Sequence, residues 1–363
     1  MKRNVLHLVG DRNVGGIGST LELIDTSVLQ ETYAFAYLET DGRISHAAKI
    51  AKAVATADVV AIHFAIRTAV LPTLALIRGL SWIYGYRTIL VEHHYSEHFQ
   101  LVGASRPRQL QRALAVASRL VERTIAVSPT QSRWLARFVP QDRLSTIASC
   151  SDLNAYLAVP RRLAERNRLV VATFGRHVLP WKGFDVLIEA ASYLQDLPIE
   201  IQIGGRGPDT ETLMRMAEGK SNVKVVGFID NLIEFLSDAD LVVIPSRWEA
   251  WGITCTEAKA ASKPVIVSDV DGLSDQFAGC GLAVPPGDAE ALAQTLRYAC
   301  TEVSREELHA WGKAGRDSVQ LATDNYIRQW RDVLQANSSD RVVSPFSVAT
   351  QSSAIASLDR QGW

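Results

Sequence analysis

Two carboxylates stand eight residues apart in the segment 245–258, whose sequence is P-S-R-W-E-A-W-G-I-T-C-T-E-A. Glu249 follows an apolar strand expected over 241–244, and Glu257 falls inside the helix expected after the loop. Gly252 lies near the start of that helix, where backbone N–H groups lack an acceptor within the helix. Carboxylates accept hydrogen bonds from vicinal hydroxyls, and amides donate them to phosphate oxygens. The combination suits a nucleotide sugar, whereas Glu257 alone would be an ordinary residue of a surface helix.

A pair of cations follows another strand of the same half. Arg176 comes after the apolar strand expected over 169–173, and Lys182 precedes Gly183 and a helix expected over 185–194. Cations beside a helix N-terminus suit a diphosphate, because the helix dipole and the two side chains both favour its negative charge. The alternative is a pair of solvated surface cations.

The first expected strand, 5–9, runs into a glycine-rich loop that ends in Gly15-Gly16-Ile-Gly18. Its spacing approaches that of a P-loop, but Gly16 stands where the phosphate-binding lysine belongs, which excludes a nucleoside triphosphatase of that type. The glycines would still let the backbone approach a phosphate or a sugar at a helix N-terminus. A plain turn between strand and helix is the alternative.

Short strands rich in Val and Ile alternate with helical stretches, which predicts βαβ units and parallel sheets. The pattern restarts after a polar linker at 161–168. We therefore expect an α/β fold of two Rossmann-like, doubly wound domains facing across a cleft, over 1–160 and 169–320. A helix at about 321–335 is expected to pack back on the first domain, and 337–363 is expected to be a flexible polar tail. The expected strands are 5–9, 59–63, 88–91, 124–127, 169–173, 199–203, 223–226, 241–244 and 264–267.

The composition is that of a globular protein of 363 residues, with 47% hydrophobic and 21% charged residues. There is no uncharged apolar run long enough to span a membrane, and the apolar stretch near the N-terminus is too short for a signal peptide. The four cysteines show neither a C-x-x-C pair nor zinc spacing and are expected to be buried thiols. We therefore expect a cytoplasmic protein, peripheral at most to the inner face of the cell membrane.

The net charge of −1 conceals an asymmetry, because residues 1–150 hold 17 Lys and Arg against 11 Asp and Glu, and the remainder holds 21 against 28. Such a split suggests that the first half faces an anionic partner. On a helix expected over 106–123, four arginines fall within about 60° of one another, opposite an apolar face. This stripe would dock on an anionic bilayer at about 1 kcal/mol per cation, unless it is only a solvated face. No nucleic-acid partner is expected. The stripe consists of Arg108, Arg112, Arg119 and Arg123.

The segment 245–258 resembles the E-x7-E motif of retaining GT-B glycosyltransferases of family 4, the glycosyl transferases group 1. The resemblance covers roughly residues 1–335 and is most specific in the second half. Two elements depart from the family pattern: Asp271-Gly272-Leu-Ser-Asp275 replaces G-G-x-x-E, and Ser149-Cys-Ser-Asp152 replaces N-G-V-D. The other landmarks fall in the family's order: Gly15-Gly16, Gly175-Arg176, Lys182-Gly183, Gly204–Pro208, Gly227 and the P-V-I-V-S-D-V-D-G segment from Pro264.

The resemblance implies a role for each position of the donor site. Arg176 and Lys182 would contact the donor diphosphate, and Glu257 would bind the ribose hydroxyls. Glu249 would lie beside the donor sugar. The facing loop of the first domain would consist of Gly15 and Gly16, and the backbone amides near sugar and phosphate oxygens would be those of Trp251, Gly252, Ile253 and Thr254.

One histidine also matches the family. His93, in Val-Glu-His-His after the strand expected over 88–91, corresponds to the family histidine near the reacting sugar. His94 is the fallback for this role, and His63 is expected to be a core residue or a support behind the site. We therefore expect His93 and Glu249 to form the catalytic pair.

The activity implied is retaining transfer of a hexose from a UDP- or GDP-sugar to a glycan or lipid-linked glycan, in bacterial surface polysaccharide biosynthesis. No metal and no other cofactor is expected, because cations and helix N-termini would take the charge of the leaving diphosphate. The D-x-D pairs Asp238–Asp240 and Asp269–Asp271 lie where aspartates commonly cap or solvate. A sugar-nucleotide epimerase of the same architecture, and a non-catalytic glycan-assembly partner with a vestigial donor site, are the alternatives.

Overall fold

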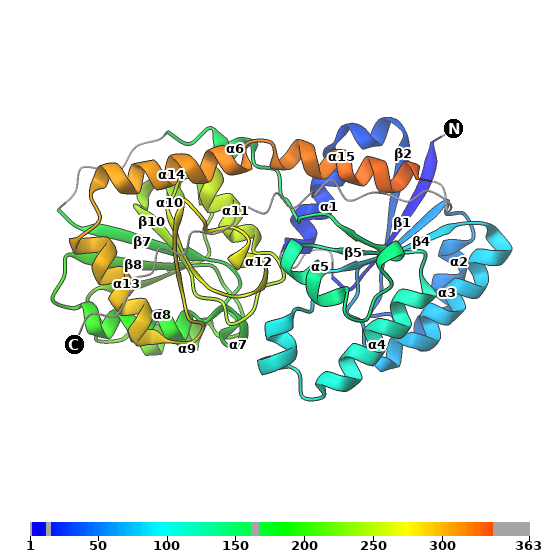
Figure 1. Ribbon diagram of the computed structural model, residues 1–363, viewed down its shortest axis with the longest axis horizontal. Coiled ribbons are helices and arrows are strands. Elements are labelled where there is room, and N and C mark those ends of the chain that lie inside the picture. The colour runs from blue at the N-terminus through cyan, green and yellow to red at the C-terminus, as the bar shows by residue number, and fades with distance from the viewer. Residues whose placement is uncertain (1, 12–15, 161–166, 337–363) are drawn as a thin grey trace.

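The computed structural model describes residues 2–11, 16–160 and 167–336. In these residues two six-stranded parallel sheets, one in each half, form the framework (Figure 1). The strand order is β2-β1-β3-β4-β5-β6 in the N-terminal domain and β12-β11-β10-β7-β8-β9 in the C-terminal domain. The predicted pair of doubly wound α/β domains is thus confirmed. Gly15, most of the expected linker and the expected tail at 337–363 lie outside the described residues.

All nine expected strands are present within two residues of their predicted bounds. The N-terminal sheet consists of β1 (Arg3–Val9), β2 (Tyr33–Glu39), β3 (Val59–Ile62), β4 (Arg87–Glu92), β5 (Arg123–Ala126) and β6 (Leu144–Thr146). The C-terminal sheet consists of β7 (Leu169–Phe174), β8 (Ile199–Gly204), β9 (Val223–Gly227), β10 (Leu241–Ile244), β11 (Val265–Ser268) and β12 (Gly281–Val284).

The strands that the sequence did not predict are β2, β6 and β12, and each lies at the edge of its sheet. An edge strand is covered incompletely, so its sequence lacks the continuous apolar run of a central parallel strand. In β2 and β12 partly exposed positions outnumber buried ones, whereas every residue of β3, β4, β5 and β7 is buried.

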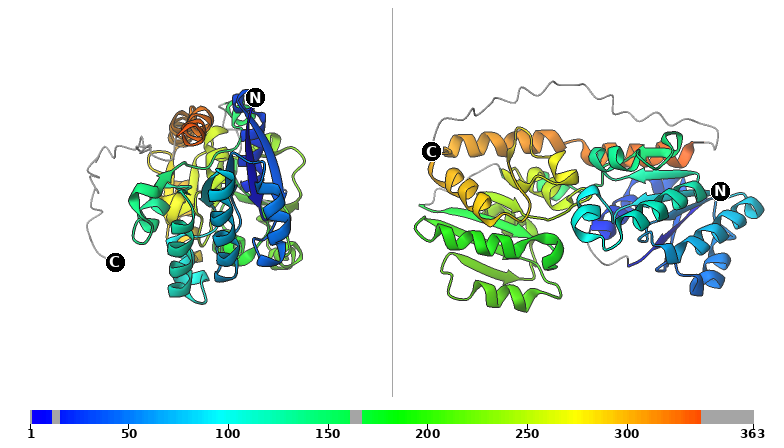
Figure 2. Two further views of the ribbon diagram at one scale, coloured as in Figure 1. Left: turned by 90° about the vertical axis from the view of Figure 1, so that its right-hand side faces the viewer. Right: turned by 60° about the horizontal axis from the view of Figure 1, so that its bottom comes forward.

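Helices cover both faces of each sheet (Figures 1 and 2). In β1, Val5 and Val9 enter the core that also holds residues of α1 and α15, while Leu6 and Leu8 enter the core beneath α2, α3 and α4. The N-terminal domain has α1 (Gly16–Thr26), α2 (Ala47–Val54), α3 (Leu71–Tyr84), α4 (Pro107–Leu120) and α5 (Pro129–Leu135), and the short α6 (Asn154–Leu157) that follows packs against α11 (Ile253–Ala260) of the C-terminal domain. The C-terminal domain has α7 (Leu179–Lys182), α8 (Phe184–Ala191), α9 (Thr210–Ala217), α10 (Leu232–Asp238), α11 (Ile253–Ala260), α12 (Asp271–Ser274), α13 (Ala289–Thr301) and α14 (Arg305–Val319).

The last described helix, α15 (Ala322–Gln335), runs on from α14 and lies over the N-terminal domain (Figure 1). Its buried face, Tyr326, Trp330, Val333 and Leu334, belongs to the same core as β1 and β4. Arg3 and Arg87 donate hydrogen bonds of 3.1 Å to the carbonyls of Leu334 and Val333. Cations there complement the negative end of the helix dipole, which fastens the helix to the N-terminal sheet.

The helix predicted over 106–123 is shorter than expected, so the prediction that Arg123 belongs to the basic stripe was wrong. Helix α4 ends at Leu120, and Val121 is already extended. Arg123 is therefore the first residue of β5, is 8% exposed and donates a 3.0 Å hydrogen bond to Ser145 Oγ. The stripe on α4 is limited to Arg108, Arg112 and Arg119, all exposed.

Candidate active site

One cavity of about 150 Å³ lies between the domains and collects residues that follow the ends of β4 and β10. Ligands of open α/β sheets bind outside the carboxyl ends of the strands, which is where these residues stand. Ile17, Val127, Ser149 and Ala250 form part of its wall. The rest of the wall consists of eight predicted site residues: Gly16, His93, Lys182, Glu249, Trp251, Gly252, Ile253 and Thr254.

Lys182 and Glu249 meet in this cavity, with Lys182 Nζ 2.5 Å from Glu249 Oε2. Lys182 ends α7, and the next residue, Gly183, has a φ of +64° and lies against the loop after β10. A Cβ on Gly183 would stand 2.0 Å from the carbonyl oxygen of Pro245, so only glycine permits this contact. Arg247, in the loop after β10, also donates two hydrogen bonds to the carboxylate of Asp185 in α8, at 2.7 and 2.9 Å.

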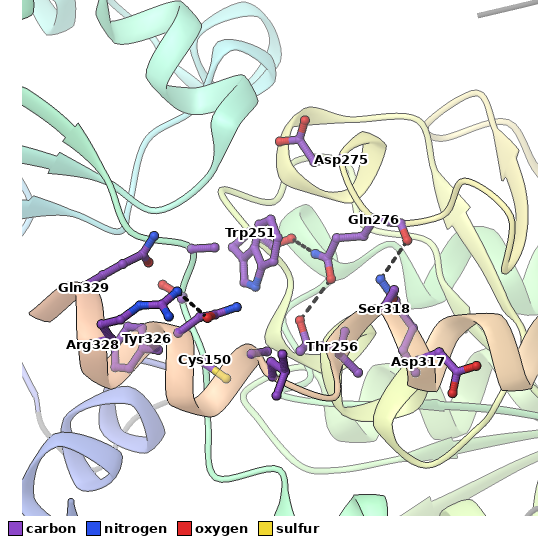
Figure 3. A pocket seen from close by; sticks show the side chains of 17 residues that line it. Cys150, Trp251, Thr256, Asp275, Gln276, Asp317, Ser318, Tyr326, Arg328 and Gln329 are labelled. Carbon is purple, nitrogen blue, oxygen red and sulfur yellow. Dashed lines mark hydrogen bonds between the residues drawn. The ribbon is translucent and has the colours of Figure 1, made fainter. Parts of the chain in front are cut away.

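The start of α11 forms another part of the cavity wall. Gly252 precedes the helix with a φ of +96°, and Ile253 and Thr254 form its first turn. The first amides of a helix have no acceptor within it, so this end favours an anion. Gln276 holds the loop in place, because its side-chain amide donates to the Trp251 carbonyl at 2.6 Å (Figure 3).

The same tryptophan borders a second cavity of about 530 Å³, shown in Figure 3. That cavity lies beside the junction of α14 and α15, where Cys150, Gln276 and Tyr326 are among its lining residues. Trp251 therefore stands between the candidate donor site and a space beside the segment where the chain crosses back to the N-terminal domain.

The N-terminal domain contributes a loop and a histidine. A Cβ on Gly16 would stand 2.7 Å from Ile253 Cδ1, so α1 begins directly opposite the start of α11. The turn that carries His93 is held by Glu92, whose Oε1 accepts hydrogen bonds from the amides of His94 and Tyr95 at 2.8 and 3.1 Å. Burial raises the pKa of Glu92 to about 7 and lowers the pKa of His93 to about 3, so His93 is a neutral imidazole at pH 7.

Three predicted positions do not line this cavity. The exposed Arg176 lies on the loop after β7. Glu257 is 9% exposed, and its Oε1 accepts a 3.1 Å hydrogen bond from Ser151 Oγ. Burial raises the pKa of Glu257 to about 7. His94 is the alternative to His93. Its Nε2 lies 2.9 Å from the backbone oxygen of His63, so this nitrogen contacts the protein backbone.

Contacts between the domains beside the cavity were not predicted. The amide and the Nδ1 of His98 lie 3.1 and 3.3 Å from Asp271 Oδ1, and the other carboxylate oxygen accepts from the Glu249 amide at 3.3 Å. Thr130 also bonds to Asp275 through its amide and its hydroxyl, at 2.9 and 2.8 Å. Both aspartates stand where the segment departs from G-G-x-x-E, so the departure itself was the available signal.

The two D-x-D pairs serve the framework. Asp240 accepts hydrogen bonds from the Val170 amide at 2.8 Å and from Arg305 at 3.4 Å. Asp269 accepts from Ser274 Oγ at 2.6 Å, and Asp271 is engaged as described. Across 2–11, 16–160 and 167–336, no three His, Cys, Asp or Glu side chains are grouped so as to hold a metal ion.

Comparison with solved structures defines the class of fold. Anabaena HepE, in complex with UDP and glucose, superposes with a TM-score of 0.71 at 18% identity, over 92% of this chain and 99% of that one. Sucrose-phosphate synthase from Thermosynechococcus elongatus gives a TM-score of 0.72 at 18% identity, over 93% and 100%. The chain therefore has the GT-B fold.

The family follows from the sequence comparison. The model of the family "Glycosyl transferases group 1" matches residues 160–318, so the C-terminal domain belongs to that family. A D-inositol 3-phosphate glycosyltransferase of Gordonia bronchialis is 28% identical over 60% of this chain and 54% of its own length. A phosphatidyl-myo-inositol mannosyltransferase of Mycobacterium leprae is 29% identical over 61% and 62%. The matched region thus spans little more than half of these relatives, and the resemblance found in the sequence is confirmed for fold and family.

Proposed function

We propose that this chain is a metal-independent, retaining glycosyltransferase that moves a hexose from a UDP- or GDP-sugar to a glycan or lipid-linked glycan. The observation that carries the proposal is the meeting of Lys182 and Glu249 at the start of α11, with His93 of the other domain in the same cavity. The names of the relatives favour a transferase over an epimerase, since two of them are a glycosyltransferase and a mannosyltransferase.

The chemistry assigned to the site is the departure of a nucleotide diphosphate. Its developing negative charge would be met by Lys182, by Arg176 once the loop after β7 turns inward, and by the amides of Ile253 and Thr254. Charge-assisted hydrogen bonds contribute about 1.5–3 kcal/mol each, so three or four such contacts would stabilise the leaving group substantially. In this mechanism Lys182 leaves Glu249 for the diphosphate, and the Glu249 carboxylate is released toward the donor sugar.

The ribose assignment also requires an exchange of partners. Glu257 bonds to Ser151 in this structure, and vicinal ribose hydroxyls would replace that contact. Because Ser151 belongs to the segment that leads out of the N-terminal domain, the exchange would couple donor binding to the arrangement of the domains.

The proposed acceptor is lipid-linked, and the surface that supports this lies on α3 and α4. These helices pack together, and α4 presents Arg108, Arg112 and Arg119. At the end of α3, Trp82 and Ile83 are 75% and 74% exposed. Cations next to exposed aromatic and apolar groups suit an anionic bilayer surface. Within the described ranges, no helix has the length and apolar character needed to cross a bilayer.

A panel of UDP-, GDP-, ADP- and TDP-sugars tests the donor assignment. We expect one nucleotide to raise the thermal midpoint and to be hydrolysed slowly, with EDTA making no difference, and the released or transferred sugar to keep its anomeric configuration by NMR. A free nucleotide sugar isomerised without acceptor would replace the proposal by the epimerase. Absence of binding by all four would replace it by the non-catalytic partner.

A further inference from the structure

Two buried histidines and the partly buried His93 form a hydrogen-bonded chain that begins at the candidate active site. His93 lines the cavity with Lys182 and Glu249, and its Nε2 lies 2.9 Å from His63 Nδ1. His63 Nε2 in turn lies 2.9 Å from Nδ1 of His7. His7 is on β1, and the others follow the ends of β3 and β4, which lie in the order β1-β3-β4. The chain thus links the cavity to the interior of the N-terminal sheet.

The rings lie in a largely desolvated environment and close to one another, which makes a charged imidazole unfavourable. His7 and His63 are 0% and 1% exposed, and the ring planes differ by 29° between His7 and His63 and by 24° between His63 and His93. Burial also lowers the pKa of His63 well below its usual value. The three imidazoles are therefore neutral, and each carries one ring proton.

Neutral rings in this geometry are constrained to a common tautomer. His63 has one N–H, so it donates to one neighbour and accepts from the other. If His63 donates through Nδ1 to His93, then His7 must donate to His63, and all three rings carry the proton on Nδ1. If His63 donates through Nε2 to His7, then all three rings carry it on Nε2. Any other combination sets two lone pairs or two N–H groups against each other at 2.9 Å.

We propose that His63 and His7 are positioning residues for His93, which fix through this chain whether His93 offers a donor or an acceptor to the ligand. Because Nε2 of His93 is engaged with His63, contact with a ligand runs through Nδ1. The state of Nδ1 is coupled to the tautomer of His7, a residue that does not line the cavity. The inference rests on the proposed function for its consequence in catalysis, and on the geometry alone for the common tautomer.

Nitrogen-15 NMR of protein with labelled histidines tests the chain at pH 7 without any ligand. We expect His7, His63 and His93 to show the same neutral tautomer, assigned with the single variants. In His7→Phe we expect the tautomer ratio at His93 to change, although the ring of His63 separates the two sites. Opposite tautomers on neighbouring rings, an imidazolium within the chain, or an unchanged His93 in His7→Phe would each overturn the proposal.

Turnover supplies the second measurement. We expect His7→Phe to lower kcat/KM about tenfold, and His7→Gln, whose amide either donates to His63 or accepts from it, to recover most of that loss. Tyr37→Phe is the matched control, because its ring stacks on His7 at 5.1 Å and remains in place. Thermal midpoints establish that the variants fold. If wild-type protein turns over no sugar nucleotide, the proposed function fails, while the NMR result still decides the chain.

Discussion

Lys182 Nζ lies 2.5 Å from Glu249 Oε2, so the cation assigned to the donor diphosphate is paired with the carboxylate assigned to the donor sugar. Neither side chain is fully buried, with 25% and 19% of their surfaces exposed. A pair that is accessible to solvent separates readily, because the medium around it screens the attraction. We therefore expect donor binding to separate the two residues, so that each contacts the ligand in place of the other.

The first prediction follows from that exchange. Lys182→Ala is expected to lower kcat/KM for the donor by ten- to several-hundredfold, since about 1.4 kcal/mol corresponds to each factor of ten. Arg176→Ala is expected to lower it over the same range. Arg215→Ala, at an exposed position of α9, serves as a control and should turn over normally. Near-normal rates in both the Lys182 and the Arg176 variants would remove the diphosphate assignment.

Glu249→Gln separates binding from chemistry. The amide keeps the size of the side chain but loses the charge, so Lys182 is released for the diphosphate while the sugar loses a carboxylate. We expect kcat to fall at least tenfold and the dissociation constant of the nucleotide diphosphate to stay the same or decrease. Calorimetry with the nucleotide and steady-state kinetics measure the two effects. A weaker nucleotide affinity with unchanged kcat would contradict the assignment.

Glu257 gives a prediction about stability and pH. Its pKa in the folded protein is raised to about 7 from an ordinary value of 4.5, chiefly by burial. The folded state therefore binds this proton more tightly, and the contribution is present below about pH 4.5 and lost as the pH rises through 7. Glu257→Gln removes this loss. The difference in unfolding free energy, variant minus wild type, should thus increase between pH 4.5 and 7.

Denaturant titrations of both proteins measure this difference between variant and wild type. The wild type alone is not diagnostic, because the lowered pKa values of His63 and His93 make its unfolding free energy rise with pH, opposite to the effect of Glu257. A difference that stays flat with pH would show that the Glu257 carboxyl is not buried as described. The same variant should weaken donor binding if ribose hydroxyls replace Ser151 at this carboxylate.

The contact between His98 and Asp271 predicts a pH-dependent link between the domains. Hydrogen bonding to Asp271 raises the pKa of His98 above its usual value near 6.5. Its contribution is fully present below about pH 6.5 and is lost as the pH rises through the raised value. In His98→Gln the pH dependence of the thermal midpoint should flatten above pH 6.5. An identical profile in wild type and variant would show that the contact contributes nothing to the fold.

Substitutions can distinguish membrane docking from a structural role, because three of the four predicted arginines are exposed and Arg123 is buried. Replacing Arg108, Arg112 and Arg119 together by Gln should abolish flotation with anionic liposomes, since about 1 kcal/mol per cation amounts to roughly a hundredfold. Arg123→Gln should leave flotation unchanged and lower the thermal midpoint, because Arg123 donates to Ser145 inside the sheet. Wild-type flotation that does not depend on anionic lipid would remove the docking surface.

The central strands and the donor loops could be predicted from local sequence patterns. Central parallel strands are buried on both faces, so β1, β3, β4, β7 and β10 appear as apolar runs that no helical period explains. The loop glycines and the E-x7-E spacing are equally local, because they reflect backbone conformation and position along a single strand–loop–helix unit. This is why the fold class and most of the cavity residues were accessible without coordinates.

The tertiary structure alone decided which residues meet. Edge strands, the end of α4 before Arg123 and the burial of Glu257 depend on what covers each segment, which a local pattern does not record. The same holds for the chain from His7 to His93, whose members are 56 and 30 residues apart and adjoin only because β3 lies between β1 and β4. A hydrogen bond is sensitive to changes of a few tenths of an ångström in the distance between donor and acceptor, and packing between elements sets that distance.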